Sequence, residues 1–217
     1  MKLACYFSHL TLTIFILSLE YWSLFEGFCL EALEFFHGLG LIHCDLKPEN
    51  MLVKSYSRSE VKMIDVGSSC FETDHLCSYV QSRSYHAPEV LLGLPYDKKI
   101  DVWSLGCILA ELCTGNVRFF FQNDSPTTLL ARVIGIISQI DQEMLVKGKD
   151  THKYFTKNHM LYEHNQDTNR LEYLIQKKTS DYQWVIKDSL ILSPIYLFDI
   201  ILISLLLDFL PFYSSFI

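Results

Sequence analysis

Glycine and proline are scarce in this sequence, at 9 and 6 of 217 residues, which excludes collagen-like and low-complexity chains. The seven cysteines are an odd number and include no Cys-x-x-Cys pair, so we expect a reducing compartment and neither a disulfide framework nor a zinc site. Basic residues are fewer than acidic ones, and the net charge of −7 argues against a nucleic-acid partner. Half of the residues are hydrophobic, which suffices for one domain with a buried core.

The two ends of the chain are apolar and differ from the middle. The uncharged run 10–19 has the outline of a secretory signal peptide, but no Ala-x-Ala-like cleavage site follows it. The longest charge-free stretch of the tail, 189–198, is shorter than the roughly 20 residues that a membrane-spanning helix needs. We therefore predict an apolar segment over 1–23, a domain over 24–180 and an apolar tail over 181–217. Membrane or secretory targeting by these ends stays open and is not favoured.

Three segments of the middle show helical patterns. Apolar residues at helical spacing predict an amphipathic helix over 28–36, which Gly38 and Gly40 end because glycine adopts the left-handed backbone of a helix C-terminus. The segment 101–112 is apolar on nearly every side, as in a helix buried at the centre of a domain. A further helix is expected over 127–140.

Short strands are expected between the first two helices. Apolar runs predict strands at 41–42, 51–53 and 61–64, and the first two of them flank a polar loop over 43–50. After the third helix, the mixed composition up to residue 180 favours loops and short helices. The sequence thus predicts a mainly α fold with a minor strand component (α+β).

Four motifs in the middle of the chain carry the functional signal. They are His-Cys-Asp-Leu-Lys-Pro-Glu-Asn at 43–50, Asp-Val-Gly at 65–67, Ala-Pro-Glu at 87–89 and Asp-Val-Trp-Ser-Leu-Gly at 101–106. Each is a weak signal alone, since Asp-x-Gly is usually a turn. In this order and spacing they resemble the C-terminal lobe of eukaryotic protein kinases. The resemblance implies a kinase C-lobe fold and ATP- and Mg²⁺-dependent phosphoryl transfer to serine or threonine of protein substrates.

The resemblance assigns roles to four residues. Asp45 matches the catalytic base that orients and deprotonates the attacking hydroxyl, and Lys47 matches a cation near the transferring phosphate. Asn50 and Asp65 match the ligands of Mg²⁺, and through it of ATP, because hard oxygen ligands suit this ion. The alternative for Asp65 is a turn residue that caps its own backbone.

A finer resemblance is to the dual-specificity tyrosine-phosphorylation-regulated kinases, most of all to their plant members. It depends on cysteine in the His-Cys-Asp motif and on the segment 78–85. The resemblance implies that Tyr79 is autophosphorylated and that Arg83 anchors the phosphate, while His86 stands where the family has a second arginine. It also implies a cytoplasmic or nuclear location. The alternative for Tyr79 is an ordinary loop tyrosine.

The first 44 residues do not match the kinase N-lobe. They contain no Gly-x-Gly-x-x-Gly loop, and their only lysine is Lys2. We therefore expect a truncated kinase, a C-lobe without the N-lobe, with impaired activity. Two alternatives stay open: a non-catalytic kinase-lobe binding module, and a truncated gene product.

Overall fold

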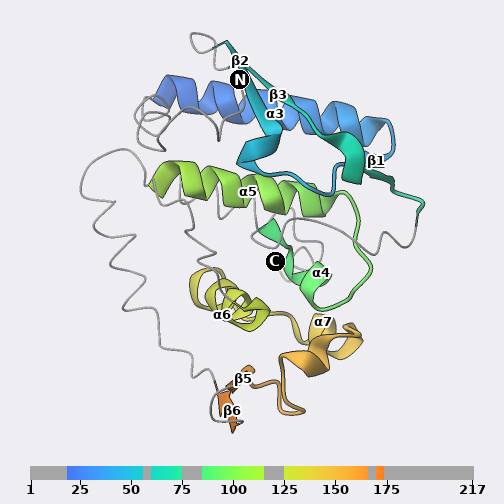
Figure 1. Ribbon diagram of the computed structural model, residues 1–217, viewed down its shortest axis with the longest axis vertical. Coiled ribbons are helices and arrows are strands. Elements are labelled where there is room, and N and C mark those ends of the chain that lie inside the picture. The colour runs from blue at the N-terminus through green and yellow to red at the C-terminus, as the bar shows by residue number, and fades with distance from the viewer. Residues whose placement is uncertain (1–18, 56–59, 75–84, 115–124, 166–169, 174–217) are drawn as a thin grey trace, which may run out of the picture. The chain divides into compact units, whose positions relative to one another are not determined.

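The computed structural model describes residues 19–55, 60–74, 85–114, 125–165 and 170–173. It combines helices with three two-stranded antiparallel sheets (Figure 1). The chain divides into two compact units. The first unit consists of Met1–Ala87 and Tyr96–Phe119, and the second of Pro88–Pro95 and Phe120–Ile217.

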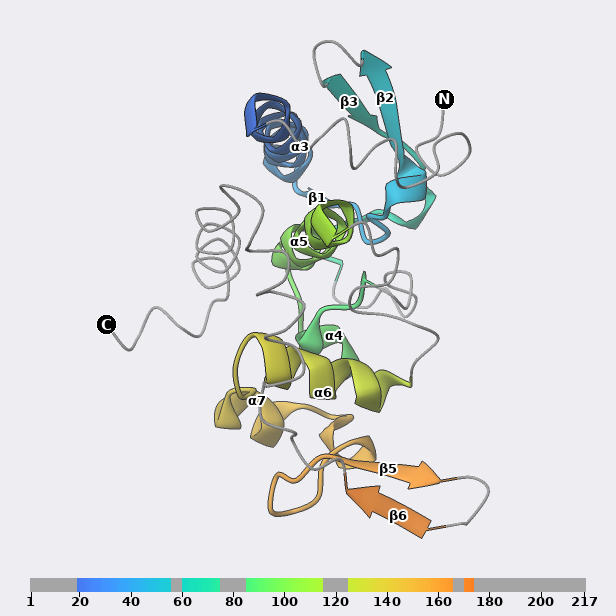
Figure 2. The ribbon, with the colours of Figure 1, turned by 90° about the vertical axis from the view of Figure 1, so that its left-hand side faces the viewer.

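Two helices, α3 (Leu19–Gly38) and α5 (Lys99–Thr114), form the body of the first unit (Figures 1 and 2). Helix α3 buries Cys29 and Leu33 and exposes Glu31 and Glu34, which confirms the predicted amphipathic pattern. It begins at Leu19, nine residues before the predicted 28–36 run.

Helix α5 is the buried element that the sequence predicts. Trp103 is 5% exposed and Ile108 is fully buried. Burial of such side chains stabilises a fold by roughly 1.5–3 kcal/mol each, so α5 contributes a large part of the apolar core of this unit. The helix exceeds the predicted 101–112 by two residues at each end, since it runs from Lys99 to Thr114.

Two short sheets frame the loops of the first unit. After α3, Gly40 has φ +73° and turns the chain into β1 (Leu41–Ile42), which pairs with β4 (Cys70–Phe71). The other sheet pairs β2 (Met51–Ser55) with β3 (Glu60–Met63), and Figure 2 shows this hairpin beside α3. The predicted strands are therefore confirmed, and the loops 43–50 and 64–69 lie at the ends of these strands.

The second unit contains α4 (Pro88–Leu91), α6 (Pro126–Ile136) and α7 (Gln142–Lys147). Helix α6 ends four residues before the predicted end at 140. Beyond α6, the Asp141 carboxylate accepts a hydrogen bond from the Glu143 amide at 2.6 Å and caps α7. An N-cap residue is not helical, so Asp141 starts a separate short helix, as expected for the stretch after the third helix.

A β-hairpin in the second unit corrects the expectation of loops and short helices. Strands β5 (Tyr162–Asn165) and β6 (Arg170–Tyr173) pair antiparallel, with Tyr162 opposite Tyr173 (Figure 2). Across both units, no helix among the described residues is long and apolar enough to cross a membrane. The tail 181–217 and nearly all of the N-terminal segment 1–23 fall outside those residues.

Candidate active site

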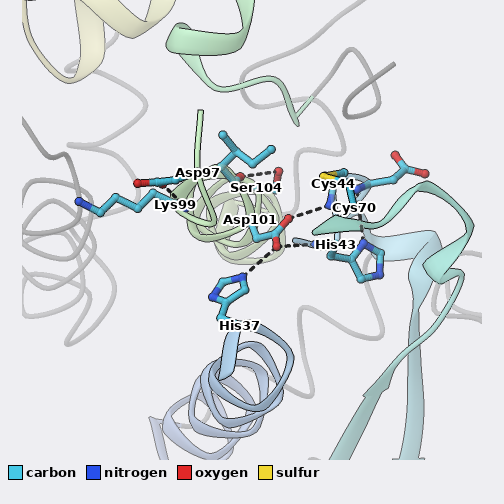
Figure 3. Close-up of polar contacts among 10 residues, drawn as sticks. His37, His43, Cys44, Cys70, Asp97, Lys99, Asp101 and Ser104 are labelled. Atoms are coloured by element: carbon cyan, nitrogen blue, oxygen red, sulfur yellow. Dashed lines mark hydrogen bonds and ion pairs between the residues drawn. The ribbon is translucent and has the colours of Figure 1, made fainter. Parts of the chain in front are cut away.

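The loop that precedes Asp45 is fixed by a carboxylate from α5. The Asp101 side chain is fully buried and accepts hydrogen bonds from the backbone amides of His43, at 2.7 Å to Oδ2, and of Cys44, at 3.0 Å to Oδ1 (Figure 3). From α3, His37 Nε2 lies 2.9 Å from Asp101 Oδ2. A buried carboxylate needs such partners, and here they hold the start of the loop against both helices.

The backbone at Cys44 shows why this anchor is needed. Cys44 has φ +65°, a left-handed conformation that costs a residue with a side chain roughly 1–3 kcal/mol. The hydrogen bond from its amide to Asp101 offsets this cost. The resulting turn directs the chain to Asp45, the next residue.

His43 connects this loop to the second motif. Its buried ring lies near Phe36, with centroids 5.8 Å apart, and its Nδ1 accepts a hydrogen bond from the Asp45 amide at 3.3 Å. The ring proton is therefore assigned to Nε2, which donates to the Ile64 carbonyl at 3.2 Å. The residue before Asp65 is thus bonded to the loop that carries Asp45.

The side chains of Asp45, Lys47 and Asn50 lie together in the loop 43–50. Lys47 Nζ lies 2.6 Å from Asp45 Oδ2, and the side chains of Asp45 and Lys47 are 16% and 24% exposed. Asn50 is buried and its Nδ2 donates to the Asp45 carbonyl at 2.9 Å and to Asp45 Oδ2 at 3.3 Å. Two donors on one oxygen fix the carboxylate at the edge of solvent, where a hydroxyl can reach it.

Asp65 lies next to this cluster through the backbone. The Ile64 amide donates a hydrogen bond to the Asn50 carbonyl at 2.9 Å. Asp65 is the residue that follows Ile64, so it lies beside the loop 43–50. Asp65 has φ +65°, and its exposed side chain makes no capping hydrogen bond to the turn Val66–Ser68. This finding argues against the alternative that Asp65 only caps its own turn.

The side-chain oxygen atoms of Asn50 and Asp65 fit a hard cation that also binds phosphate oxygens. Asn50 and Asp65 offer amide and carboxylate oxygens, which are the ligands that Mg²⁺ prefers. Within the described ranges, no three histidine, cysteine, aspartate or glutamate side chains gather to form an all-protein metal site. Mg²⁺ usually keeps waters and phosphate oxygens beside one or two protein ligands, so two such residues suffice.

A second buried polar contact fixes the segment before the Ala-Pro-Glu motif. The Tyr85 hydroxyl donates to Glu111 Oε2 at 2.8 Å, and the Ser104 hydroxyl lies 3.1 Å from the Tyr85 carbonyl. Burial raises the pKa of Glu111 to about 7, the hydrogen bond from Tyr85 lowers it, and the nearby Glu49 raises it. Burial and the Glu111 carboxylate together raise the pKa of the Tyr85 hydroxyl.

Sequence reasoning missed three of these contributors. Asp101 was recognised as part of a motif, but no role was predicted for Asp101, His37 or Glu111. The available signal was an acidic side chain in an otherwise apolar helix, since a charge buried in a core needs partners. Tyr79 and Arg83, the predicted phosphosite and its anchor, lie outside the described residues.

The comparisons with known proteins agree with this geometry. A family model described as the protein kinase domain matches residues 16–177, which is most of the chain. The chain therefore belongs to the protein kinase domain family.

Among curated proteins, its relatives include dual-specificity tyrosine-phosphorylation-regulated kinases. The mouse kinase 3 of that name is 41% identical over 164 residues, 68% of this chain and 28% of the relative. Its human counterpart is 40% identical over 164 residues, 68% of this chain and 27% of the relative. The serine/threonine-protein kinase ppk5 of Schizosaccharomyces pombe is 42% identical over 126 residues, 58% of this chain and 15% of the relative. The chain thus spans less than a third of the length of these relatives.

Proposed function

We propose that the chain carries the phosphoryl-transfer site of a protein serine/threonine kinase of the dual-specificity, tyrosine-regulated type. The observation that carries the proposal is the fixed Asp45 carboxylate, 2.6 Å from Lys47 Nζ and 3.3 Å from Asn50 Nδ2, on a loop bonded to Asp101. Phosphoryl transfer depends almost entirely on positioning and electrostatic stabilisation, and these contacts supply both.

Each residue has a distinct part in this proposal. Asp45 accepts a hydrogen bond from the attacking serine or threonine hydroxyl and takes its proton as the oxygen attacks. Lys47 stabilises negative charge on the transferring phosphate. Asn50 and Asp65 hold Mg²⁺, which neutralises charge on the nucleotide phosphates when it is bound.

The finer resemblance adds regulation and partners. Tyr79 is proposed as a site of autophosphorylation and Arg83 as the anchor of its phosphate. The partners are protein substrates, in the cytoplasm or nucleus, and the four buried cysteines that form no disulfide, Cys29, Cys44, Cys70 and Cys107, are compatible with a reducing compartment. Resemblance to plant members of the family supports the same assignment.

The 217-residue chain alone is proposed to transfer phosphate poorly. No lysine occurs between Lys2 and Lys47. A kinase needs a lysine–glutamate pair and a glycine-rich loop to hold the nucleotide phosphates. By analogy with single oxyanion donors, each lost contact costs roughly 3–4 kcal/mol, so the rate falls by several orders of magnitude. This supports the alternative of a non-catalytic binding module for the isolated chain.

The test of the site is nucleotide binding rather than turnover. A fluorescent ATP analogue is titrated into the purified chain with and without Mg²⁺. We expect weak binding that requires Mg²⁺ and is lost in Asp65→Asn. The control is Asp74→Asn, the same change at an exposed aspartate whose contact is local, from the Phe71 amide at 3.3 Å. Binding that is absent in the unmodified chain, or equal in both variants, contradicts the proposal.

Turnover is measured separately with radiolabelled ATP and Asp45→Asn as the control. Only traces of label should reach the chain or an added protein substrate. Strong incorporation that Asp45→Asn abolishes would show that other residues of the chain hold the nucleotide phosphates.

A further inference from the structure

An apolar patch lies on the surface of the first unit, where α3 ends and the β1–β4 ladder begins. Phe35 is 71% exposed, Leu39 is 56% exposed and Phe71 is 55% exposed, and the half-buried Leu41 completes the patch. Large apolar side chains that are exposed together on a folded protein commonly mark an interaction site. We propose that this apolar patch is a docking site for a peptide segment of another protein, with basic residues beside apolar ones.

The end of α3 supplies two of the four side chains. Phe35 and Leu39 are four positions apart, and residues at this spacing share one face of a helix. The Leu39 amide donates to the Phe36 carbonyl at 3.2 Å, so the helical turn continues to Leu39, one residue past the end of α3. Phe35 and Leu39 therefore lie beside each other on the surface.

The β1–β4 ladder supplies the other two side chains. Leu41 stands opposite Phe71, so both side chains lie on one face of the ladder, whereas the next pair, which includes the buried Ile42, faces the core. The Glu72 amide donates to the Gly40 carbonyl at 2.8 Å. This bond fixes β4 against the short turn between α3 and β1, so the four apolar side chains are neighbours on one surface.

The surroundings of the apolar patch are acidic. Four exposed carboxylates flank it: Glu31, Glu34, Glu72 and Asp74. The first two lie within one helical turn of Phe35, and the Asp74 carboxylate accepts a hydrogen bond from the Phe71 amide at 3.3 Å. None of the four forms an ion pair within the described ranges, and the sequence has no lysine or arginine at 3–46 or 63–82. A ligand complementary to both features carries positive charge beside apolar side chains.

The same observations argue against two other occupants. A second copy of the chain would bring the same acidic residues face to face in a symmetric contact, and like charges across an interface are unfavourable. The two phenylalanines expose roughly 250 Å², far below the roughly 800 Å² that each partner buries in a stable protein–protein interface. The segment 189–217 of the chain itself contains no lysine or arginine and offers no complementary charge.

The apolar patch contains none of the proposed phosphoryl-transfer residues. It borders both site loops, because β1 leads directly into the loop 43–50 and β4 follows Asp65 by five residues. A peptide docked on the patch is therefore held near the proposed site. Docking requires neither a nucleotide nor phosphoryl transfer, so it would serve a kinase and a non-catalytic binding module alike.

The chemistry of the ligand is tested with a library of random peptides displayed on phage. The full chain and its variant with Phe35→Ser and Phe71→Ser are immobilised, and peptides that bind the chain but not the variant are sequenced. We expect these peptides to be enriched in lysine or arginine next to leucine, isoleucine or phenylalanine. A selection without this enrichment, or without any peptide that distinguishes the two proteins, overturns the proposal.

Binding of the selected peptide is then measured by fluorescence anisotropy. Phe71→Ser and Glu34→Lys should each weaken binding about tenfold or more, and added salt should weaken it because exposed charges are screened. The matched control is Val146→Ser, at a side chain of the second unit that is 70% exposed, and it should bind as the unmodified chain does. Equal binding by Phe71→Ser and Val146→Ser overturns the proposal. No nucleotide is present, so a failure here is distinct from failure of the proposed function.

A photo-cross-linking residue shows what occupies the apolar patch. The full chain with p-benzoylphenylalanine in place of Phe35 is irradiated with the selected peptide, and the products are identified by mass spectrometry. We expect the peptide linked at position 35. A link between two copies of the chain, or to another segment of the same chain, in place of the peptide would overturn the proposed occupant.

Discussion

Replacing Asp101 by asparagine tests how the active-site loop is held. The aspartate is fully buried and satisfies three donors: the His43 amide and His37 Nε2 at Oδ2, and the Cys44 amide at Oδ1. Asparagine has nearly the same shape but only one acceptor oxygen. Its amide nitrogen must therefore face one of the backbone amides.

The magnitude follows from counting the donors that lose their acceptor. If the new oxygen takes the place of Oδ2, His43 and His37 keep their partner and the Cys44 amide is left buried without one. An unsatisfied buried donor costs about 1–3 kcal/mol, so we expect Asp101→Asn to destabilise the chain by that amount. Asp101→Ala leaves all three donors unsatisfied and should cost about 3–5 kcal/mol.

The assay is urea unfolding together with amide hydrogen exchange at Cys44. The matched control is Asp97→Asn, four residues earlier, where Oδ1 accepts from the Lys99 amide at 2.7 Å. Asparagine accepts such a bond as well as aspartate, so this variant should be nearly neutral. In Asp101→Asn, exchange at Cys44 should accelerate more than the loss of global stability explains. Equal stability of the two variants would refute the account of the anchor.

Three further predictions concern stability. Burial raises the pKa of Glu111 from 4.5 to about 7, so protonated Glu111 contributes its full stabilisation below about pH 4.5, and this contribution is lost as the pH rises through about 7. Glu111→Gln should remove up to about 3 kcal/mol of this pH dependence of the free energy of unfolding, measured in urea. Unchanged pH dependence would contradict the prediction. A Cβ at Gly148 would contact Thr151 Oγ1 and lie 2.8 Å from the Leu92 carbonyl oxygen, so Gly148→Ala should lower the melting temperature, at a cost of about 1–3 kcal/mol. Gly135→Ala should not, because its Cβ would meet no atom within 4 Å beyond its chain neighbours and its own helix backbone. Ser125→Ala removes the acceptor of the Thr128 amide at the start of α6 and should cost about 1 kcal/mol in urea unfolding; no loss would show that this cap is dispensable.

Elements with a strong local pattern were predictable from the sequence. The buried helix α5 follows from its apolar residues, and β1 follows from the apolar pair after Gly40. The end of α6 was not predictable, because apolar residues at helical spacing continue to 140 although the helix ends at Ile136. The hairpin β5–β6 was missed because strands of four residues rich in polar side chains carry little periodic signal.

The sequence likewise predicts some contacts of the candidate site and not others. Asp45, Lys47 and Asn50 lie within six positions of one another, so a motif alone brings their side chains together. The anchor at Asp101 joins residues 57 to 64 positions apart, through contacts that exist only once α3 and α5 have packed. The contact of Cys44 Sγ with Cys70 Sγ, at 3.4 Å, likewise depends on the pairing of β1 with β4, which cysteine spacing does not reveal.

The central claim is that the segment 45–65 binds a metal–nucleotide complex through Asn50 and Asp65. The most direct measurement replaces Mg²⁺ by paramagnetic Mn²⁺ and records nuclear magnetic resonance spectra of the labelled chain with a non-hydrolysable ATP analogue. We predict that the amide signals of Asn50 and Asp65 broaden first and that Asp65→Asn abolishes the effect. Broadening centred on another part of the chain, or unaffected by this substitution, would contradict the claim.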